Sequence, residues 1–194
     1  MNTNYSVNQP AFSARLKLNG INLDRAKLAK AEETFSKLTQ HYKNDELVIQ
    51  AYKVDRPDNT YFHVADFLVD NKIAATSEPL KEFKPWFNNA TAEDIGNAFA
   101  RIFKKGKYEG KAMPKVENLQ GRVAHQKQMA EVNKLRAKKS GNEVFETLAK
   151  QNTAAAAKTQ KILDKETAKC DATVAKITDF ESDIPIMDWK TWDA

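Results

Sequence analysis

The segment from Leu23 to Tyr42 constrains the fold of this chain more than any other stretch. Its apolar residues recur at intervals of three and four, which places them on one face of an α-helix: Leu28, Ala31, Phe35, Leu38 and Tyr42. Asp24 precedes this pattern and is a suitable N-cap, because its carboxylate can accept from the amides of the first turn. A one-sided helix must bury its apolar face, so we expect an apolar sheet beside it.

The flanking sequence predicts the strands of that sheet. Residues 12–18 alternate between apolar and polar, as in a half-buried strand, and the Asn19-Gly20 pair that follows is typical of a tight turn. Residues 47–54 and 61–69 are rich in β-branched and aromatic side chains. Between them, the turn-forming sequence at 56–59 predicts a hairpin.

Two shorter helices complete the predicted core. Ser77 could cap the first, which Pro85 must stop or kink, and Thr91 with Asp94 resembles a capping box that opens the second. The second helix is expected to end near Gly106. No fourth strand is evident after it, so an open three-stranded sheet is favoured over a ferredoxin-like fold. The predicted fold class is α+β: a small antiparallel-rich β-α-β-β sheet packed by helices, followed by an extended C-terminal helical arm.

The composition changes after residue 106, which suggests further segments. Glycine and proline without periodicity predict a linker at 107–121. Two helices separated by Ser140-Gly141-Asn142 form the predicted helical arm, and in the second helix a small or apolar residue recurs every seven positions. The expected division is a flexible leader at 1–10, an α+β core at 11–106, the linker at 107–121, the helical arm at 122–178 and an acidic, tryptophan-containing tail at 179–194.

Several classes of protein are disfavoured by composition. The chain has no run of 18 apolar residues, and its first residues lack both a basic start and an apolar stretch, so neither a membrane span nor a secretory signal is expected. Cys170 is the only cysteine, which excludes a disulfide framework and a multi-cysteine zinc site within one chain. A cytoplasmic location is the simplest expectation.

The residues that could carry catalysis are scattered. His41, His63 and His125 lie in different predicted elements, and no glycine-rich phosphate loop is present. His63 could be a general base or a half-buried histidine with a backbone partner. Asp66 and Asp70 would share one strand face, either as an acid–base pair or facing water, and Cys170 could be a reactive thiol or a small packing residue. We favour the structural alternative in each case and expect no enzyme, cofactor or metal.

The charge is distributed unevenly along the chain. A lysine-rich segment, residues 101–139, has a net charge of +9, whereas residues 177–194 have a net charge of −4. Phe99, Phe103 and Tyr108 interleave with the first cations of this segment, a combination that can follow a nucleic-acid strand and stack bases. The alternative is a solvated helix end beside a buried core. The candidate nucleic-acid-binding residues are Arg101, Lys104, Lys105, Lys107, Lys111 and Lys115.

The acidic tail contains two of the three tryptophans, both within the last six residues. Exposed tryptophans are costly unless they dock, so one hypothesis makes Ile186, Trp189 and Trp192 the anchors of a partner-binding peptide. In the alternative, the tail folds back on the lysine-rich segment of its own chain. Truncation after Ile177 would separate these hypotheses through its effect on thermal stability.

The sequence therefore predicts a non-enzymatic interaction or structural protein. Its helical arm and acidic tail would dock an unknown protein partner or a second copy. The alternative is a non-specific nucleic-acid-binding protein that uses the lysine-rich segment, with binding that weakens steeply as salt is added.

Overall fold

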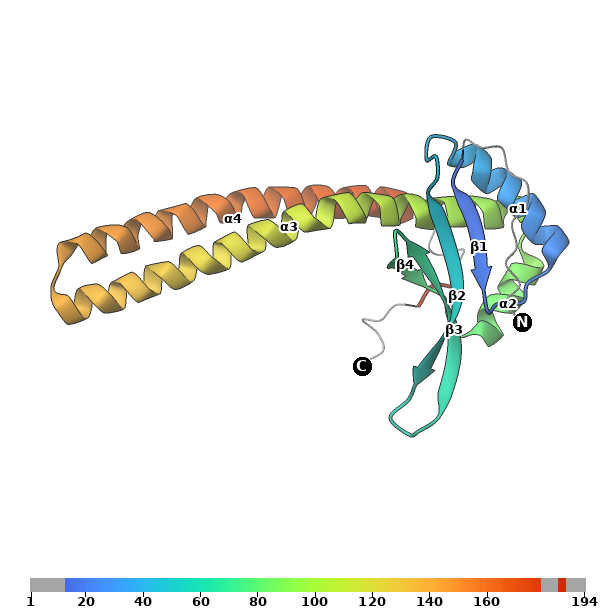
Figure 1. Cartoon of the computed structure of the whole chain (residues 1–194), viewed down its shortest axis with the longest axis horizontal. Helices are drawn as coiled ribbons and strands as arrows, with labels where there is room; N and C mark the ends of the chain where they lie inside the picture. The colour runs from blue at the N-terminus through green and yellow to red at the C-terminus, as the bar shows by residue number, and fades with distance from the viewer. Residues whose placement is uncertain (1–12, 179–184, 188–194) are drawn as a thin grey trace. The chain divides into compact units, whose positions relative to one another are not determined.

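The computed structural model describes residues 13–178 and 185–187 (Figure 1). The chain divides into two compact units: unit 1 comprises residues 1–110 and 175–194, and unit 2 comprises residues 111–174. A mixed four-stranded sheet with helices is followed by a long C-terminal helical region, which confirms the predicted α+β class.

The sheet of unit 1 has the strand order β1-β2-β3-β4, with β1 (Arg15–Asn19), β2 (Glu46–Asp55), β3 (Tyr61–Val69) and β4 (Lys72–Thr76). Strands β1 and β2 are parallel, as expected when a helix connects them, and the other two pairs are antiparallel hairpins. The predicted hairpin between β2 and β3 is confirmed: Asn59 has a positive φ, and the Asp58 carboxylate accepts from the backbone N–H of Thr60 (3.0 Å).

The expectation of three strands is wrong, because β4 follows β3 directly. Asp70 and Asn71 between them both have positive φ angles, 52° and 61°. This is the backbone geometry of the two-residue turns that join tight hairpins, and aspartate and asparagine tolerate it better than most residues. A fourth strand is therefore added at the edge of the sheet.

The first helix of unit 1 forms as predicted, and the second does not begin as expected. In α1 (Arg25–Leu38), the Asp24 carboxylate accepts from the backbone N–H of Lys27 at 2.8 Å. In α2 (Leu80–Asn89), Pro79 takes the N-cap position and no side chain caps the helix, so the prediction that Ser77 is the cap is wrong. Pro85 lies inside α2, which continues to Asn89.

The core of unit 1 lies between the helices and one face of the sheet. Because side chains alternate along a strand, Leu47 and Ile49 of β2 share this face with Ala65, Phe67 and Val69 of β3. The helices contribute a buried set of aromatic rings: Phe35, Phe83, Phe87, Phe99 and Phe103. The rings of Phe35 and Phe103 meet edge to face with centroids 5.7 Å apart, an arrangement that favours one packing over others.

Helix α3 (Ala92–Ser140) begins as predicted, with the backbone N–H of Asp94 donating to the Thr91 hydroxyl at 3.1 Å. It does not end near Gly106, and residues 107–121, expected as a linker, are helical throughout. Gly106 has a packing role, because a Cβ there would lie 2.8 Å from the Cβ of Val69 and 2.9 Å from that of Ala74. This glycine allows α3 to approach β3 and β4 closely.

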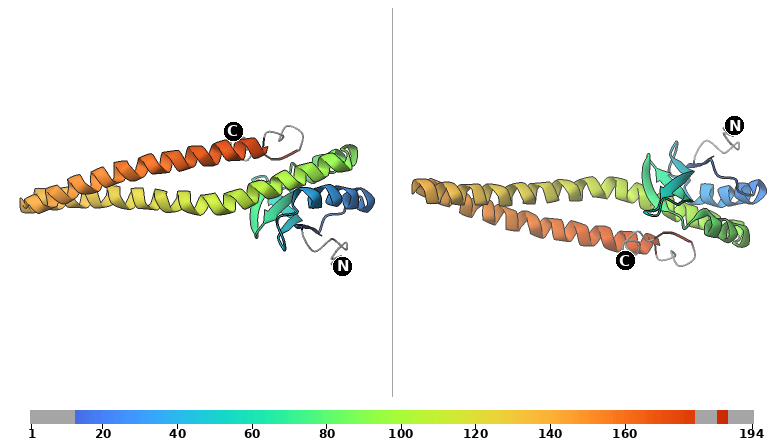
Figure 2. Two further views of the ribbon diagram at one scale, coloured as in Figure 1. Left: turned by 90° about the horizontal axis from the view of Figure 1, so that it is seen from above. Right: turned by 90° about the horizontal axis from the view of Figure 1, so that it is seen from below.

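Unit 2 consists of the later part of α3 and most of α4 (Glu143–Thr178), which run antiparallel (Figure 2). The predicted break at residues 140–142 is confirmed. Gly141 has a φ of +64°, and its N–H donates to the carbonyl of Ala137 at 2.8 Å, which ends α3. Asn142 then caps α4, with its side-chain oxygen accepting from the N–H of Val144 at 2.9 Å.

A narrow row of buried side chains, here called the seam, holds α3 and α4 together in unit 2. The predicted seven-residue series is buried on α4 at Ala149, Ala156, Leu163 and Cys170. On α3 the buried residues are Val116, Leu119, Val123, Ala130, Asn133 and Ala137. Of these residues, Leu163 of α4 forms an apolar cluster with Val116, Leu119 and Val123 of α3. The side-chain amide oxygen of Gln126 is also buried and has no hydrogen-bond partner, so the seam contains a polar defect.

Candidate functional site

The C-terminal segment 185–187 pairs with the end of β4 within unit 1. The N–H of Glu78 donates to the carbonyl of Pro185 (2.6 Å), and the N–H of Met187 donates to the carbonyl of Thr76 (2.8 Å). Ser77 and Ile186 form an antiparallel bridge between these two bonds. Residues 185–187 thus extend the sheet in the manner of a peptide that adds a strand to an exposed edge.

The side chains of this segment enter apolar surroundings on both sides of the sheet. Ile186 packs against the main core of unit 1, whereas Met187 is only 8% exposed and packs with Val54, Val64 and Phe62. Of the three predicted tail anchors, Ile186 therefore contacts its own chain. Trp189 and Trp192 lie outside the described residues. A tail that folds back on its own chain was expected to contact the lysine-rich segment. The described contact is instead with the β4 edge.

Polar groups at this edge are arranged around Ser77, which is fully buried. Its hydroxyl accepts from the N–H of Ala65 (2.8 Å) and donates to the carbonyl of Glu78 (2.7 Å), so it ties β3 to the residues that follow β4. Asp66 is 2% exposed and accepts from the hydroxyl of Thr76 at 2.9 Å. Burial raises the pKa of the Asp66 carboxyl, and the single hydrogen bond from Thr76 opposes this only in part.

The two carboxylates that could have formed an acid–base pair have separate roles. Asp66 is buried and bonded to Thr76, whereas Asp70 lies in the turn before β4 and forms an ion pair with Lys107 (2.8 Å). His63 is exposed, and Tyr61 contacts its ring edge to face. Across the β2–β3 pair, His63 lies opposite Lys53, which forms an ion pair with Asp55 (2.8 Å).

The six candidate cations of the lysine-rich segment differ in their surroundings. Lys107 bridges Asp45 (3.1 Å) and Asp70 (2.8 Å), and only 14% of its side chain is exposed. Partial burial lowers the pKa of Lys107, but its hydrogen bonds to the two carboxylates outweigh that effect, so the pKa is raised. Lys115 pairs with Glu166 of α4 at 2.8 Å and thereby lowers the pKa of that carboxyl. At least two of the six cations therefore have structural partners.

The aromatic residues that interleave with these cations are also used by the fold. Phe99 and Phe103 are completely buried in unit 1, as the structural alternative predicted. The other part of that alternative, a solvated helix end, is wrong because α3 continues to Ser140. Of the three aromatic residues that could stack a base, only Tyr108 is partly exposed.

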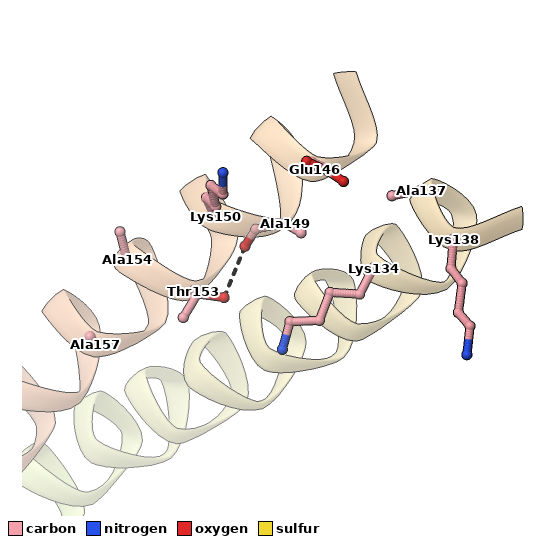
Figure 3. Close-up of a pocket in the computed structure, with 9 residues that line it drawn as sticks. All are labelled: Lys134, Ala137, Lys138, Glu146, Ala149, Lys150, Thr153, Ala154 and Ala157. Carbon is pink, nitrogen blue, oxygen red and sulfur yellow. Dashed lines mark hydrogen bonds between the residues drawn. The ribbon is translucent and has the colours of Figure 1, made fainter. Parts of the chain in front are cut away.

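A shallow groove of about 840 Å³ lies on unit 2, near the turn between α3 and α4 (Figure 3). It is lined by Lys134, Ala137, Lys138, Glu146, Ala149, Lys150, Thr153, Ala154 and Ala157. The alanines leave room because their side chains end at Cβ, and the Thr153 hydroxyl is turned to the carbonyl of Ala149 (2.9 Å). The result is a mainly apolar surface with three lysines and one glutamate.

Several large apolar side chains of unit 2 are directed to solvent. Leu135 and Val144 are each 60% exposed, Ile162 is 50% exposed and Leu148 is 37% exposed. Met113 is a fifth, at 40%. Single exposed apolar residues are common on proteins, but five on a two-helix unit with a small core form a larger fraction of its apolar content. Neither these residues nor the groove was predicted from the sequence. The signal for the groove in the sequence is the run of four alanines at 154–157, two of which line it.

Comparison with protein-family models, with curated proteins and with solved structures finds no match for this chain. Among the described residues, no helix has the length and apolar content needed to cross a membrane. The same residues contain no group of three or more histidine, cysteine, aspartate or glutamate side chains placed to hold a metal ion.

Proposed function

We propose that this chain is a non-enzymatic interaction or structural protein, in which unit 1 is a scaffold and unit 2 presents a docking surface. The observation that carries the proposal is the imbalance within unit 2. Large apolar side chains such as Leu135 and Val144 are exposed, while the buried seam consists mostly of alanine and polar residues. A partner that covers the exposed residues would bury apolar area that unit 2 leaves in water.

The absence of a catalytic arrangement among the described residues is compatible with this proposal. The buried carboxyl of Asp66 has a structural partner in Thr76, and His63 is exposed opposite Lys53 of β2. A cytoplasmic location is part of the proposal and can be tested by cell fractionation.

The test compares partner capture by three forms of the full chain in cells that naturally produce it. The test variant is Leu135→Glu/Leu148→Glu, and the matched control is Gln128→Glu/Gln151→Glu, which adds the same charge at exposed positions of the same helices. We expect the same bound protein with the wild type and the control and its loss with the test variant, since a buried carboxylate opposes apolar docking. Equal binding by all three forms, or no binding by any form, would overturn the proposal.

The alternative, a non-specific nucleic-acid-binding protein, has less support. Lys107 and Lys115 form ion pairs within the chain, and two of the three aromatic residues beside the cations are buried. Lysine-dominated binding of this kind would appear as retention on heparin or single-stranded DNA that falls between low and moderate salt. We expect no such retention, and its appearance, with loss in a Lys104→Glu/Lys111→Glu variant, would favour the alternative.

A further inference from the structure

We propose that the groove on unit 2 of one copy binds residues 188–194 from the acidic tail of a second copy. This inference rests on the proposed function and names the partner and the surface. The occupant is inferred from the chemistry of the groove, and the second copy from where the start of this segment is bound.

The groove requires an occupant that is both apolar and anionic. Its alanines provide an apolar floor, and Lys138 and Lys150 border it together with Glu146. Lys134 is the third lysine of the groove, and it forms an exposed ion pair with Glu131 on its own helix (2.7 Å). Its volume, about 840 Å³, is within the range of sites that hold bulky organic groups. Flat aromatic rings suit such a floor, because they bury a large area on a shallow surface and can accept cation–π contacts from lysine.

Residues 188–194 have this combination of properties. They contain Trp189 and Trp192, three positions apart, with Asp188 and Asp193 outside them and Lys190 as the only cation. The other tryptophan of the chain, Trp86, already packs against the core of unit 1. Acidic residues that flank aromatic anchors match an apolar floor bordered by lysines, so both the charge and the apolar content are complementary.

The donor is assigned to a second copy because the start of this segment is already bound. Ile186 and Met187 pair with the β4 edge of their own chain, and Trp192 follows Met187 by five residues, about 17 Å of extended chain. Ala157 is the groove residue nearest the C-terminal end of α4, and it lies 21 residues, about 32 Å of helix, before Thr178. Each copy then offers one groove and one tail. In a two-fold dimer, the tail of each copy occupies the groove of the other, and both contacts are satisfied. If each tail instead bound the groove of a further copy, head-to-tail contacts would produce open chains.

The test uses sedimentation velocity on the full-length chain and two variants that each lack one side of the contact. Lys134→Glu/Lys138→Glu removes the acceptor charge but keeps the tail, and Trp189→Ala/Trp192→Ala removes the anchors but keeps the groove. We expect the wild type to self-associate in a concentration-dependent and salt-sensitive way, and either variant alone to associate about tenfold more weakly. An equimolar mixture of the two variants should form a heterodimer, because it restores one intact contact.

A charge-matched control is Lys127→Glu/Lys139→Glu, which reverses two exposed lysines of α3 outside the groove and should associate as the wild type does. Thermal unfolding of each variant checks that the fold is retained. Three results would overturn the inference: a wild type that stays monomeric, variants that associate normally, or a mixture that does not form heterodimers. A monomeric wild type would leave the proposed function intact, since partner capture is tested separately through Leu135 and Leu148.

Discussion

The two units of this chain hold their helices in place by different means. In unit 1, large aromatic rings such as Phe35, Phe99 and Phe103 are completely inaccessible and lie between three helices and a sheet. In unit 2, the most deeply buried residues retain about 4% exposure and include Ala130, Ala149 and Asn133. Unit 1 therefore derives its stability from burying large side chains, whereas unit 2 has little apolar area to bury.

This difference shows where the chain can accept a partner. A close-packed core excludes other molecules, and among the described residues of unit 1 the β4 edge is paired with residues 185–187. Two helices joined by small residues leave grooves and exposed apolar side chains on their outer surfaces, as seen at Ala154 and Leu135. The weakness of the seam and the availability of a docking surface therefore have the same origin, the small size of the buried side chains.

The largest expected effect comes from removing one buried side chain in each unit. Phe103→Ala should lower the free energy of unfolding by about 3–5 kcal/mol, because it also removes the ring contacts with Phe35 and Tyr42. Leu163→Ala should cost about 2 kcal/mol, since its cluster has only four members and can relax. Native-state hydrogen exchange measures each unit separately, and a larger loss for Leu163→Ala would contradict the comparison.

A glycine-to-alanine change should have opposite signs in the two units. At Gly96, a Cβ would lie 2.5 Å from the carbonyl oxygen of Ala31 and 2.6 Å from the Cβ of Thr34, so Gly96→Ala should destabilise unit 1 by about 2 kcal/mol. At Gly121, no atom lies within 4 Å of the added Cβ, and Gly121→Ala should stabilise the helix by about 0.5–1 kcal/mol. Thermal unfolding of both variants measures the two changes in stability. If both variants were stabilised, or both destabilised, packing at these two glycines would not distinguish the units.

Sequence predicted the features that depend on neighbouring residues. The periodicity of α1, its cap at Asp24, the cap at Thr91 and the turn at Gly141 all form as expected. Each is decided within one or two helical turns by hydrogen bonds or side-chain direction, so a single sequence contains the necessary information.

The missed features depend on contacts between distant residues. Gly106 suggested a helix end, but its lack of a side chain serves the approach of α3 to Val69 and Ala74. Strand β4 contains two alanines and only one large apolar residue, and its best signal was the Asp70-Asn71 turn. The pairing of Ile186 with Ser77 joins residues far apart in the chain, and the groove needs both α3 and α4. Apart from the Asp70-Asn71 turn, none of these features follows from local pattern.

Two truncations test how much the C-terminal segment contributes to unit 1. A chain ending at Ile177 loses Ile186, Met187 and the two backbone bonds to Glu78 and Thr76. We expect it to be less stable by about 1–2 kcal/mol, which corresponds to a melting temperature lower by about 3–6 °C. A chain ending at Met187 keeps these contacts and should melt as the full chain does, when both are measured at a concentration that keeps the full chain monomeric. Equal melting temperatures for both truncations would show that the segment adds no stability to unit 1.

A further small effect is expected in the pH dependence at Asp66, a buried carboxyl in unit 1. Burial raises the pKa of this carboxyl above its unfolded value, so between the two values the folded state binds more protons than the unfolded state. The free energy of unfolding of the wild type therefore falls as pH rises through that window. Asp66→Asn cannot ionise and keeps an oxygen acceptor for the Thr76 hydroxyl, so it should lack this fall and be about 1 kcal/mol more stable at neutral pH. Urea unfolding of both forms across the acidic range measures the difference. Parallel curves would mean that Asp66 is hydrated when ionised, and the core of unit 1 would then be less tightly closed at this edge than its burial indicates.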